Sequence, residues 1–130
     1  MQRVLLGISI LVTLLCNITF AYGQKQTERY IPLGQSPGVS GKYTLIGEIR
    51  TVDPQAQALT ILGPSGTQTA IVTPRTKIWL DRSKLKLTNL TGGFSDLRVG
   101  RRAEVKYEDA QKKKFAEWIK VQLTEADSPP

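Results

Sequence analysis

Four clusters of basic side chains are the residues in this sequence whose type and spacing are best suited to bind a partner. They are Arg75/Lys77, Arg82/Lys84/Lys86, Arg98/Arg101/Arg102 and Lys112/Lys113/Lys114. The last cluster falls at an expected hairpin tip, where three like charges have full access to water. Such a cluster either solvates a turn or contacts a polyanion, with an affinity that falls steeply as salt rises. The formal net charge of +7 favours an anionic partner but also aids solubility, so both interpretations stay open.

Aromatic side chains are spaced between these clusters and could stack against a ligand. They are Trp79, Phe94, Tyr107 and Trp118. OB folds often combine such a platform with a basic groove, but aromatics in a small β domain also fill the core. Trp118 alternates out of phase with the apolar residues that follow it, so we expect it to be exposed. The candidate binding surface comprises Trp118, Trp79, Arg101, Arg102, Lys112, Lys113 and Lys114.

The residue types that the sequence lacks exclude several classes of enzyme and metal site. The chain has no histidine, its only cysteine is Cys16 in the N-terminal apolar segment, and its only methionine is Met1. Ser-His-Asp and Cys-His schemes need a base that titrates near neutrality, and zinc or copper sites need Cys, His or Met ligands. We therefore expect a protein that is not an enzyme and that has no cofactor and no metal site.

Carboxylates alone leave one alternative open. Glu108 and Asp109 at one turn and Asp53 at another could contribute oxygen ligands to a hard cation such as calcium. These loops lack the dense ligand spacing of a calcium loop, and no two carboxylates stand out as a general acid and base. A carboxylate-dependent metal carrier or a divergent hydrolase is therefore the second hypothesis.

Residues 1–23 are typical of a secretory signal peptide. Met1 to Arg3 is short and positive, 4–20 is almost wholly apolar, and Ala21-Tyr22-Gly23 places small residues ahead of a cut before Gln24. The alternative is a retained membrane anchor, although an apolar run of about 17 residues is at the short limit for spanning a bilayer. We expect cleavage, and hence an exported protein, periplasmic or secreted, that meets the membrane only transiently through this signal peptide.

The rest of the chain divides into a leader, one domain and a tail. Residues 24–41 are polar and rich in Gly and Pro, with neither helical nor strand periodicity, which predicts a flexible leader. Residues 124–130 have a similar composition and predict a disordered tail. The expected folded unit is the β domain at 42–123.

Strand signals follow one another closely within this unit. Alternation, β-branched and aromatic residues, and intervening turn residues predict strands at 43–52, 58–62, 67–73, 76–80, 101–107 and 115–123. Gly47, within the first strand, suggests a bulge or bend. At most one short helical turn is expected, at 94–100, and no helix is long enough for a parallel crossover. The sequence therefore predicts an all-β fold, a small antiparallel OB-like barrel of about six strands.

Short motifs spread over 47–121 allow a comparison with known families. They are Gly-Glu-Ile-Arg-Thr-Val-Asp at 47–53 with Ala-Leu-Thr-Ile at 58–61, Thr-Lys-Ile at 76–78, 95–100 with 103–105, and Ala116 with Ile119. Together they resemble an uncharacterised family of small secreted bacterial OB-like β-barrel domains of unknown function. The opening is also similar to that of periplasmic copper chaperones, small OB-like barrels that bind metal through His, Met and Trp. This sequence contains Trp79 and Trp118 but lacks the His and both Met, so no metal-site residue can be carried over and the resemblance implies the barrel without its metal site.

These observations predict an exported, non-catalytic binding module of the bacterial envelope or extracellular space. Its partner would be a protein or an anionic polymer. Export makes nucleic acid a less suitable partner than an envelope component.

Overall fold

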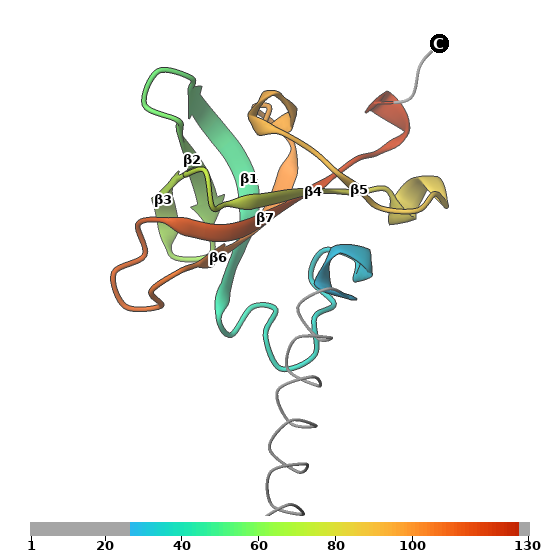
Figure 1. Ribbon diagram of the computed structural model, residues 1–130, viewed down its shortest axis with the longest axis horizontal. Helices are drawn as coiled ribbons and strands as arrows, with labels where there is room; N and C mark the ends of the chain where they lie inside the picture. The colour runs from blue at the N-terminus through green and yellow to red at the C-terminus, as the bar shows by residue number, and fades with distance from the viewer. Residues whose placement is uncertain (1–26, 128–130) are drawn as a thin grey trace, which may run out of the picture.

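The computed structural model describes residues 27–127, whose regular structure consists of β-strands and short 3₁₀ turns (Figure 1). The strands are β1 (Thr44–Asp53), β2 (Ala58–Gly63), β3 (Gly66–Ile71), β4 (Lys77–Asp81), β5 (Leu90–Thr91), β6 (Arg102–Tyr107) and β7 (Ala116–Gln122). The 3₁₀ turns are η1 (Glu28–Tyr30), η2 (Ser83–Leu85), η3 (Phe94–Asp96) and η4 (Glu125–Asp127). The predicted mostly-β fold is confirmed. The expected signal peptide at 1–23 lies outside the described residues.

All the strands belong to one mixed sheet, in the order β3-β2-β1-β6-β7-β4-β5. β4 runs parallel to β7, and every other neighbouring pair is antiparallel. The prediction of a purely antiparallel sheet is therefore wrong at one pair, because the chain crosses from β5 to β6 before it returns along β7. The described residues form seven strands instead of about six, since Leu90–Thr91 adds a short edge strand, and four helical turns instead of at most one.

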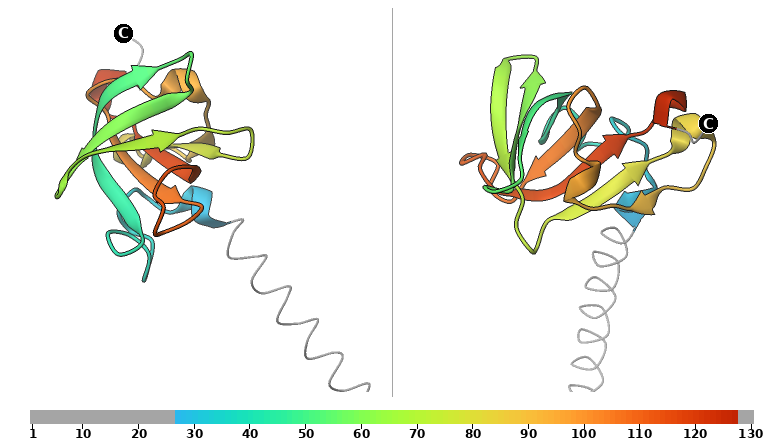
Figure 2. Two further views of the ribbon diagram at one scale, coloured as in Figure 1. Left: turned by 90° about the vertical axis from the view of Figure 1, so that its left-hand side faces the viewer. Right: turned by 90° about the horizontal axis from the view of Figure 1, so that it is seen from above.

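The sheet is strongly curved but not closed (Figure 2). At the end of β3, Ile71 forms an isolated parallel bridge with Phe115, and its N–H donates to the carbonyl of Lys114 at 2.9 Å. The next N–H on this edge, that of Thr73, donates to Oγ1 of Thr76 at 2.9 Å instead, so the contact does not continue. Within residues 27–127, the edge strands β3 and β5 do not pair with each other, so the predicted closed barrel is not confirmed.

Alternation along the strands places the hydrophobic core on one face of the sheet. Ala103 and Val105 of β6 pair with Val121 and Ile119 of β7, and all four side chains are fully buried. The buried cluster comprises Ile49, Leu59, Ile61, Ala70, Ile78, Leu97, Ala103, Val105, Tyr107, Ala116, Ile119 and Val121. This period-two pattern is the reason why the strands could be predicted from the sequence.

Gly47 has a different role from the predicted bulge. The irregularity in the pairing of β1 with β2 falls between Ile49 and Thr51. A Cβ atom on Gly47 would lie only 2.0 Å from the carbonyl oxygen of Leu62. Glycine is thus required because two backbones approach each other closely at this position.

Residues 27–43, which we call the strap, lie across the face of the sheet opposite the core (Figure 1). Leu33 at the middle of the strap is only 6% exposed, and its N–H donates to Oδ2 of the buried Asp81 at 2.9 Å. Consecutive turns, such as the one closed by Gln35 N–H to Pro32 O at 3.0 Å, give the strap its shape. The structure therefore differs from the expected flexible leader over 27–41.

The expected tail also differs over the part that the structure describes. Asp127 in η4 accepts from Nε of Arg101 at 3.1 Å and from Nη2 of Arg101 at 2.5 Å. The hydrogen bond from the Thr124 N–H, followed by the contact with Arg101, lowers the pKa of Asp127. Residues 124–127 are thus held against the sheet, while 128–130 lie outside the described residues.

Candidate functional site

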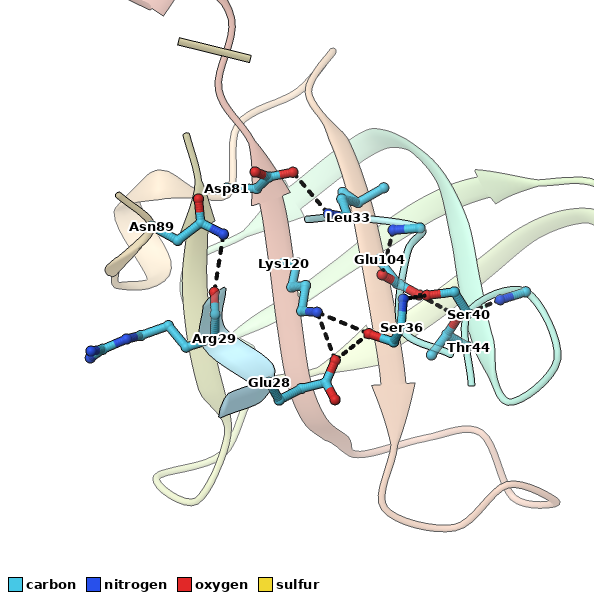
Figure 3. Close-up of polar contacts among 12 residues, drawn as sticks. Glu28, Arg29, Leu33, Ser36, Ser40, Thr44, Asp81, Asn89, Glu104 and Lys120 are labelled. Carbon is cyan, nitrogen blue, oxygen red and sulfur yellow. Dashed lines mark hydrogen bonds and ion pairs between the residues drawn. The ribbon is translucent and has the colours of Figure 1, made fainter. Parts of the chain in front are cut away.

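Buried charges on the strap side of the sheet hold the strap in place (Figure 3). Lys120 of β7 is 1% exposed, and its Nζ atom contacts Oε1 of Glu28 at 2.7 Å and Oγ of Ser36 at 3.1 Å. The Ser36 hydroxyl in turn donates to Glu28. The charge of Lys120 is therefore compensated by two strap residues that lie far from it in the sequence.

Glu104 of β6 is fully buried and also depends on the strap and its junction with β1. Its Oε1 atom accepts from the N–H of Gly34 at 2.9 Å, and its Oε2 atom accepts from the hydroxyls of Ser40 at 2.6 Å and Thr44 at 2.7 Å. Glu104 forms no ion pair within residues 27–127. Hydrogen bonds alone therefore compensate the cost of burying this carboxylate.

These contacts fix the segment that joins the strap to β1. The Gly41 N–H donates to Oγ1 of Thr44 at 2.9 Å, and the Tyr43 N–H donates to the carbonyl of Val39 at 2.8 Å. Lys42 and Tyr43 are consequently held at a defined position although both are exposed. The buried Glu104 thus positions an exposed cation and an exposed aromatic ring through Ser40 and Thr44.

A groove with a volume of about 720 Å³ begins at this segment. Its walls are the start of β1, the β2–β3 turn and the β6–β7 hairpin, and its lining includes Lys42, Tyr43, Gln68, Arg102, Tyr107 and Lys113. This volume lies in the usual range for ligand sites. None of the lining residues is acidic.

The cations of the groove have no carboxylate partner. Lys42, Arg102 and Lys113 form no ion pair within residues 27–127, and Lys42 instead lies 5.5 Å from the centre of the Tyr43 ring. The carboxylates that do form ion pairs contact other cations, in the pairs Glu28–Lys120, Glu48–Arg50, Glu108–Arg75, Glu117–Lys106 and Asp127–Arg101. The groove is therefore a region of uncompensated positive charge.

Tyr107 closes the floor of the groove beside the core. Its side chain is buried, and its hydroxyl donates to the carbonyl of Thr69 in β3 at 2.7 Å. Burial disfavours the phenolate and raises the pKa of Tyr107 to about 12. This hydrogen bond connects the β6–β7 hairpin with β3 across the groove.

We expect Tyr107 to make the fold sensitive to alkali. Tyrosine in an unfolded chain ionises at about pH 10, while Tyr107 keeps its proton in the folded protein up to about pH 12. Between these values the unfolded state binds fewer protons, so the free energy of unfolding should fall as the pH rises. Urea titrations between pH 8 and pH 12 measure this slope.

Tyr107→Phe is the control for this prediction. It should cost about 1 kcal/mol at neutral pH, because the Thr69 carbonyl loses a buried donor. It should also flatten the pH dependence above pH 10. An unchanged slope in the variant would show that another group causes the alkaline loss.

The structure places the two predicted tryptophans together, but not at the surface. Trp79 and Trp118 have ring centres 5.7 Å apart and planes tilted by 38°, and Nζ of Lys120 lies 4.8 Å from the Trp118 ring. Trp118 is 5% exposed, so the expectation that it is exposed is wrong. Its alternation with Ile119 was interpreted correctly, but the face on which it lies is covered by the strap.

The predicted basic residues separate into structural and accessible groups. Arg101 is occupied by Asp127 and also donates from Nη1 to the carbonyl of Asp96 at 2.8 Å. Arg102 and Lys113 line the groove. Lys112 and Lys114 are exposed on the same hairpin as Lys113, and Nζ of Lys114 lies 5.3 Å from the centre of the Phe115 ring.

Lys42 and Tyr43 were missed by the sequence analysis. They stand at the boundary between the predicted leader and the first predicted strand, where no periodicity marks them. The one available signal was the triplet Gly41-Lys42-Tyr43, a turn residue followed by a cation and an aromatic. Their position on the groove depends on contacts with Glu104, which lies about 60 residues further along the chain.

The carboxylates considered for a cation site are engaged in turns and ion pairs. Glu108 contacts Arg75 at 3.2 Å, Asp109 accepts from the N–H of Gln111 at 2.9 Å, and Asp53 accepts from the N–H of Gln55 at 3.0 Å. Residues 27–127 contain no group of three side chains suited to hold a metal ion. Over the same residues, no helix is long and apolar enough to cross a bilayer.

Comparison with known proteins finds weak structural similarity only. No protein-family model and no curated protein sequence matches this chain. A tryptophan-to-alanine variant of CusF from Escherichia coli, with Cu(II), is similar over 62% of this chain and 91% of that chain, at 16% identity and a TM-score of 0.44. Ag(I)CusF is similar over 60% of this chain and 93% of that chain, at 15% identity and a TM-score of 0.41. Similarity at this level assigns neither a ligand nor a function to the present chain.

Proposed function

We propose that this chain is a non-catalytic binding module that holds an anionic polymer in the groove. The main support is that Lys42, Arg102 and Lys113 line a single groove without any acidic lining residue. A polyanion that binds such cations releases its condensed counterions, which drives association and makes it dependent on salt. Tyr43, which is 54% exposed, adds an aromatic surface at one end of the groove.

The form of the groove suits an extended polymer. One wall of the groove is the segment 41–46, which comprises the end of the strap and the start of β1 before its first pairing with β2 at Glu48. Lys42 and Tyr43 lie in a turn, and Thr44 to Ile46 continue this wall in extended conformation over about 7 Å. A charged polymer that follows this wall would bring its anionic groups next to Lys42, Arg102 and Lys113.

Fold and sequence add two further elements to the proposal. The β1-β2-β3 meander, the position of β6 beside β1 and the parallel contact of Ile71 with Phe115 support an OB-like arrangement. The signal-like segment at 1–23 supports export to the periplasm or beyond. The polymer would then belong to the envelope or the medium, and an acidic polysaccharide is the class that we favour.

Binding to immobilised heparin, a sulfated polysaccharide, over a salt series tests this proposal. The protein tested is 24–130, which contains every described element. A variant with Lys42→Gln, Arg102→Gln and Lys113→Gln should reduce the slope of log affinity against log salt by about two to three. It should elute at much lower salt than the unaltered protein.

A second triple variant removes the same charge elsewhere. Lys77→Gln, Lys84→Gln and Arg98→Gln change three exposed cations that form no ion pair within the described residues. This variant should keep most of the salt slope. Equal losses in the two variants would contradict the groove, and no retention at low salt would direct the search to protein partners.

A further inference from the structure

A second surface lies at the other end of the molecule, on the loop that joins β4 to β5. Figure 1 shows this loop and the β6–β7 hairpin at opposite sides of the sheet. Residues 82–95 include Arg82, Lys84 and Lys86 but no Asp or Glu. The loop exposes Leu87 at 51%, and the adjoining strand β5 exposes Leu90 at 44%.

The loop is built as a fixed turn. The N–H groups of Leu85 and Leu87 donate to the carbonyl of Arg82 at 2.9 and 3.2 Å, and Nε of Arg82 donates to the carbonyl of Thr88 at 2.7 Å. Lys86 has a φ of 58°, a left-handed conformation that costs less with glycine or asparagine. The buried Asp81 and Asn89 also accept from the N–H groups of Ser83 and Arg82, so backbone and side-chain hydrogen bonds together hold this loop in place.

The strap extends this surface across the edge of the sheet. The buried Asn89 donates from Nδ2 to the carbonyl of Arg29 at 3.1 Å, and Nη1 of Arg29 contacts Oγ1 of Thr91 at 3.4 Å. Tyr30 is 50% exposed beside Arg29, whose guanidinium lies 4.4 Å from the centre of the Tyr30 ring. An aromatic and a further cation thus lie next to the edge strand β5.

We propose that this end of the molecule docks onto the surface of an anionic lipid bilayer. Exposed leucines enter the boundary between headgroups and acyl chains, tyrosine lies at headgroup level, and Lys and Arg side chains bind lipid phosphates. No residue of 82–95 is acidic, and Glu125 of η4 lies beside Lys84, so Arg82, Lys84 and Lys86 together leave this end of the molecule with the excess of positive charge that an anionic leaflet attracts. This inference uses none of the residues of the groove, so it stands independently of the proposed function.

Sedimentation of 24–130 with vesicles tests the inference, using phosphatidylglycerol mixed with phosphatidylcholine and, separately, phosphatidylcholine alone. Binding is expected with the first vesicles and should be much weaker with the second. Lys84→Gln/Lys86→Gln should weaken binding by a factor on the order of ten. Leu87→Ser/Leu90→Ser should weaken it as well while leaving retention on heparin unchanged, because both leucines are exposed and the groove is intact.

Other outcomes would overturn the inference. Unchanged vesicle binding by the leucine variant would show that the exposed leucines do not contribute and that only nonspecific charge attraction is at work. Equal binding to both kinds of vesicle would show that the anionic headgroup is not recognised. The groove variant with Lys42→Gln, Arg102→Gln and Lys113→Gln separates the two surfaces. If this variant no longer binds vesicles, the lipid contact lies in the groove. If it still binds vesicles but is no longer retained on heparin, the two surfaces are separate.

Discussion

Glu104→Leu is expected to lower the free energy of unfolding by about 3–5 kcal/mol. The substitution leaves the Gly34 N–H and the hydroxyls of Ser40 and Thr44 without their acceptor on the strap side of the sheet. These three hydrogen bonds are partly buried, and a donor that loses its partner away from water costs about 1–3 kcal/mol. Urea unfolding followed by tryptophan fluorescence measures the loss, since Trp79 and Trp118 pack together beneath the strap.

Two comparisons decide whether the cost arises from this network. Glu104→Gln keeps one acceptor oxygen and should fall between the leucine variant and the unaltered protein. Glu117→Leu removes a carboxylate that is 43% exposed and paired with Lys106, and should cost less than about 1 kcal/mol. Similar losses for Glu104→Leu and Glu117→Leu would mean that the strap contacts add little to stability.

The same substitution also tests the link between the network and the groove. Ser40 and Thr44 hold the segment that presents Lys42 and Tyr43, and both depend on Glu104. Under conditions where Glu104→Leu remains folded, its retention on heparin should therefore be weaker than that of Glu117→Leu.

The strands could be predicted because their signal is local. In β6, alternate residues are buried in the core, and the period of two is visible in the sequence alone. The parallel pairing of β4 with β7 could not be predicted in the same way, because it depends on where the chain returns after β5. The sequence lacks the helix that usually forms a parallel crossover, and here the connection from β4 to β7 passes through β5, η3 and β6.

The strap escaped prediction for a related reason. Its contacts are single polar contacts between residues distant in sequence, such as Glu28 with Lys120, which are separated by 92 positions. Gly- and Pro-rich composition does indicate the absence of helix and strand, but not the absence of fixed structure. The burial of Glu104 and Lys120 has the same cause, because a polar face of a strand is exposed unless another segment covers it.

The candidate site was predicted in part. Arg102 and Lys113 were predicted from charge clusters, and both line the groove. Arg101 was predicted in the same way but forms an ion pair with Asp127. Charge clustering cannot distinguish the two neighbours, since that distinction depends on where β6 begins, which is at Arg102, and on the position of η4, which brings Asp127 to Arg101. Trp118 shows the converse error, because its face was predicted correctly and its cover was not.

The pair formed by Lys120 and Glu28 should respond unequally to the loss of either partner. Glu28→Ala leaves the ammonium of Lys120 buried with Ser36 and the Trp118 ring beside it but no carboxylate partner, and should cost about 3 kcal/mol or more. Lys120→Met fills most of the same volume without charge, and Glu28, whose side chain is 19% exposed, can turn toward water. We expect Lys120→Met to cost about 1 kcal/mol and the double variant to resemble it, so that the coupling free energy between the two sites is on the order of 3 kcal/mol.

The partly exposed pair Lys106 and Glu117 serves as the control, and its cycle of Lys106→Met and Glu117→Ala should give less than about 1 kcal/mol. Additive losses at Lys120 and Glu28 in urea unfolding would show that the strap is held mainly by the burial of Leu33 and not by this ion pair.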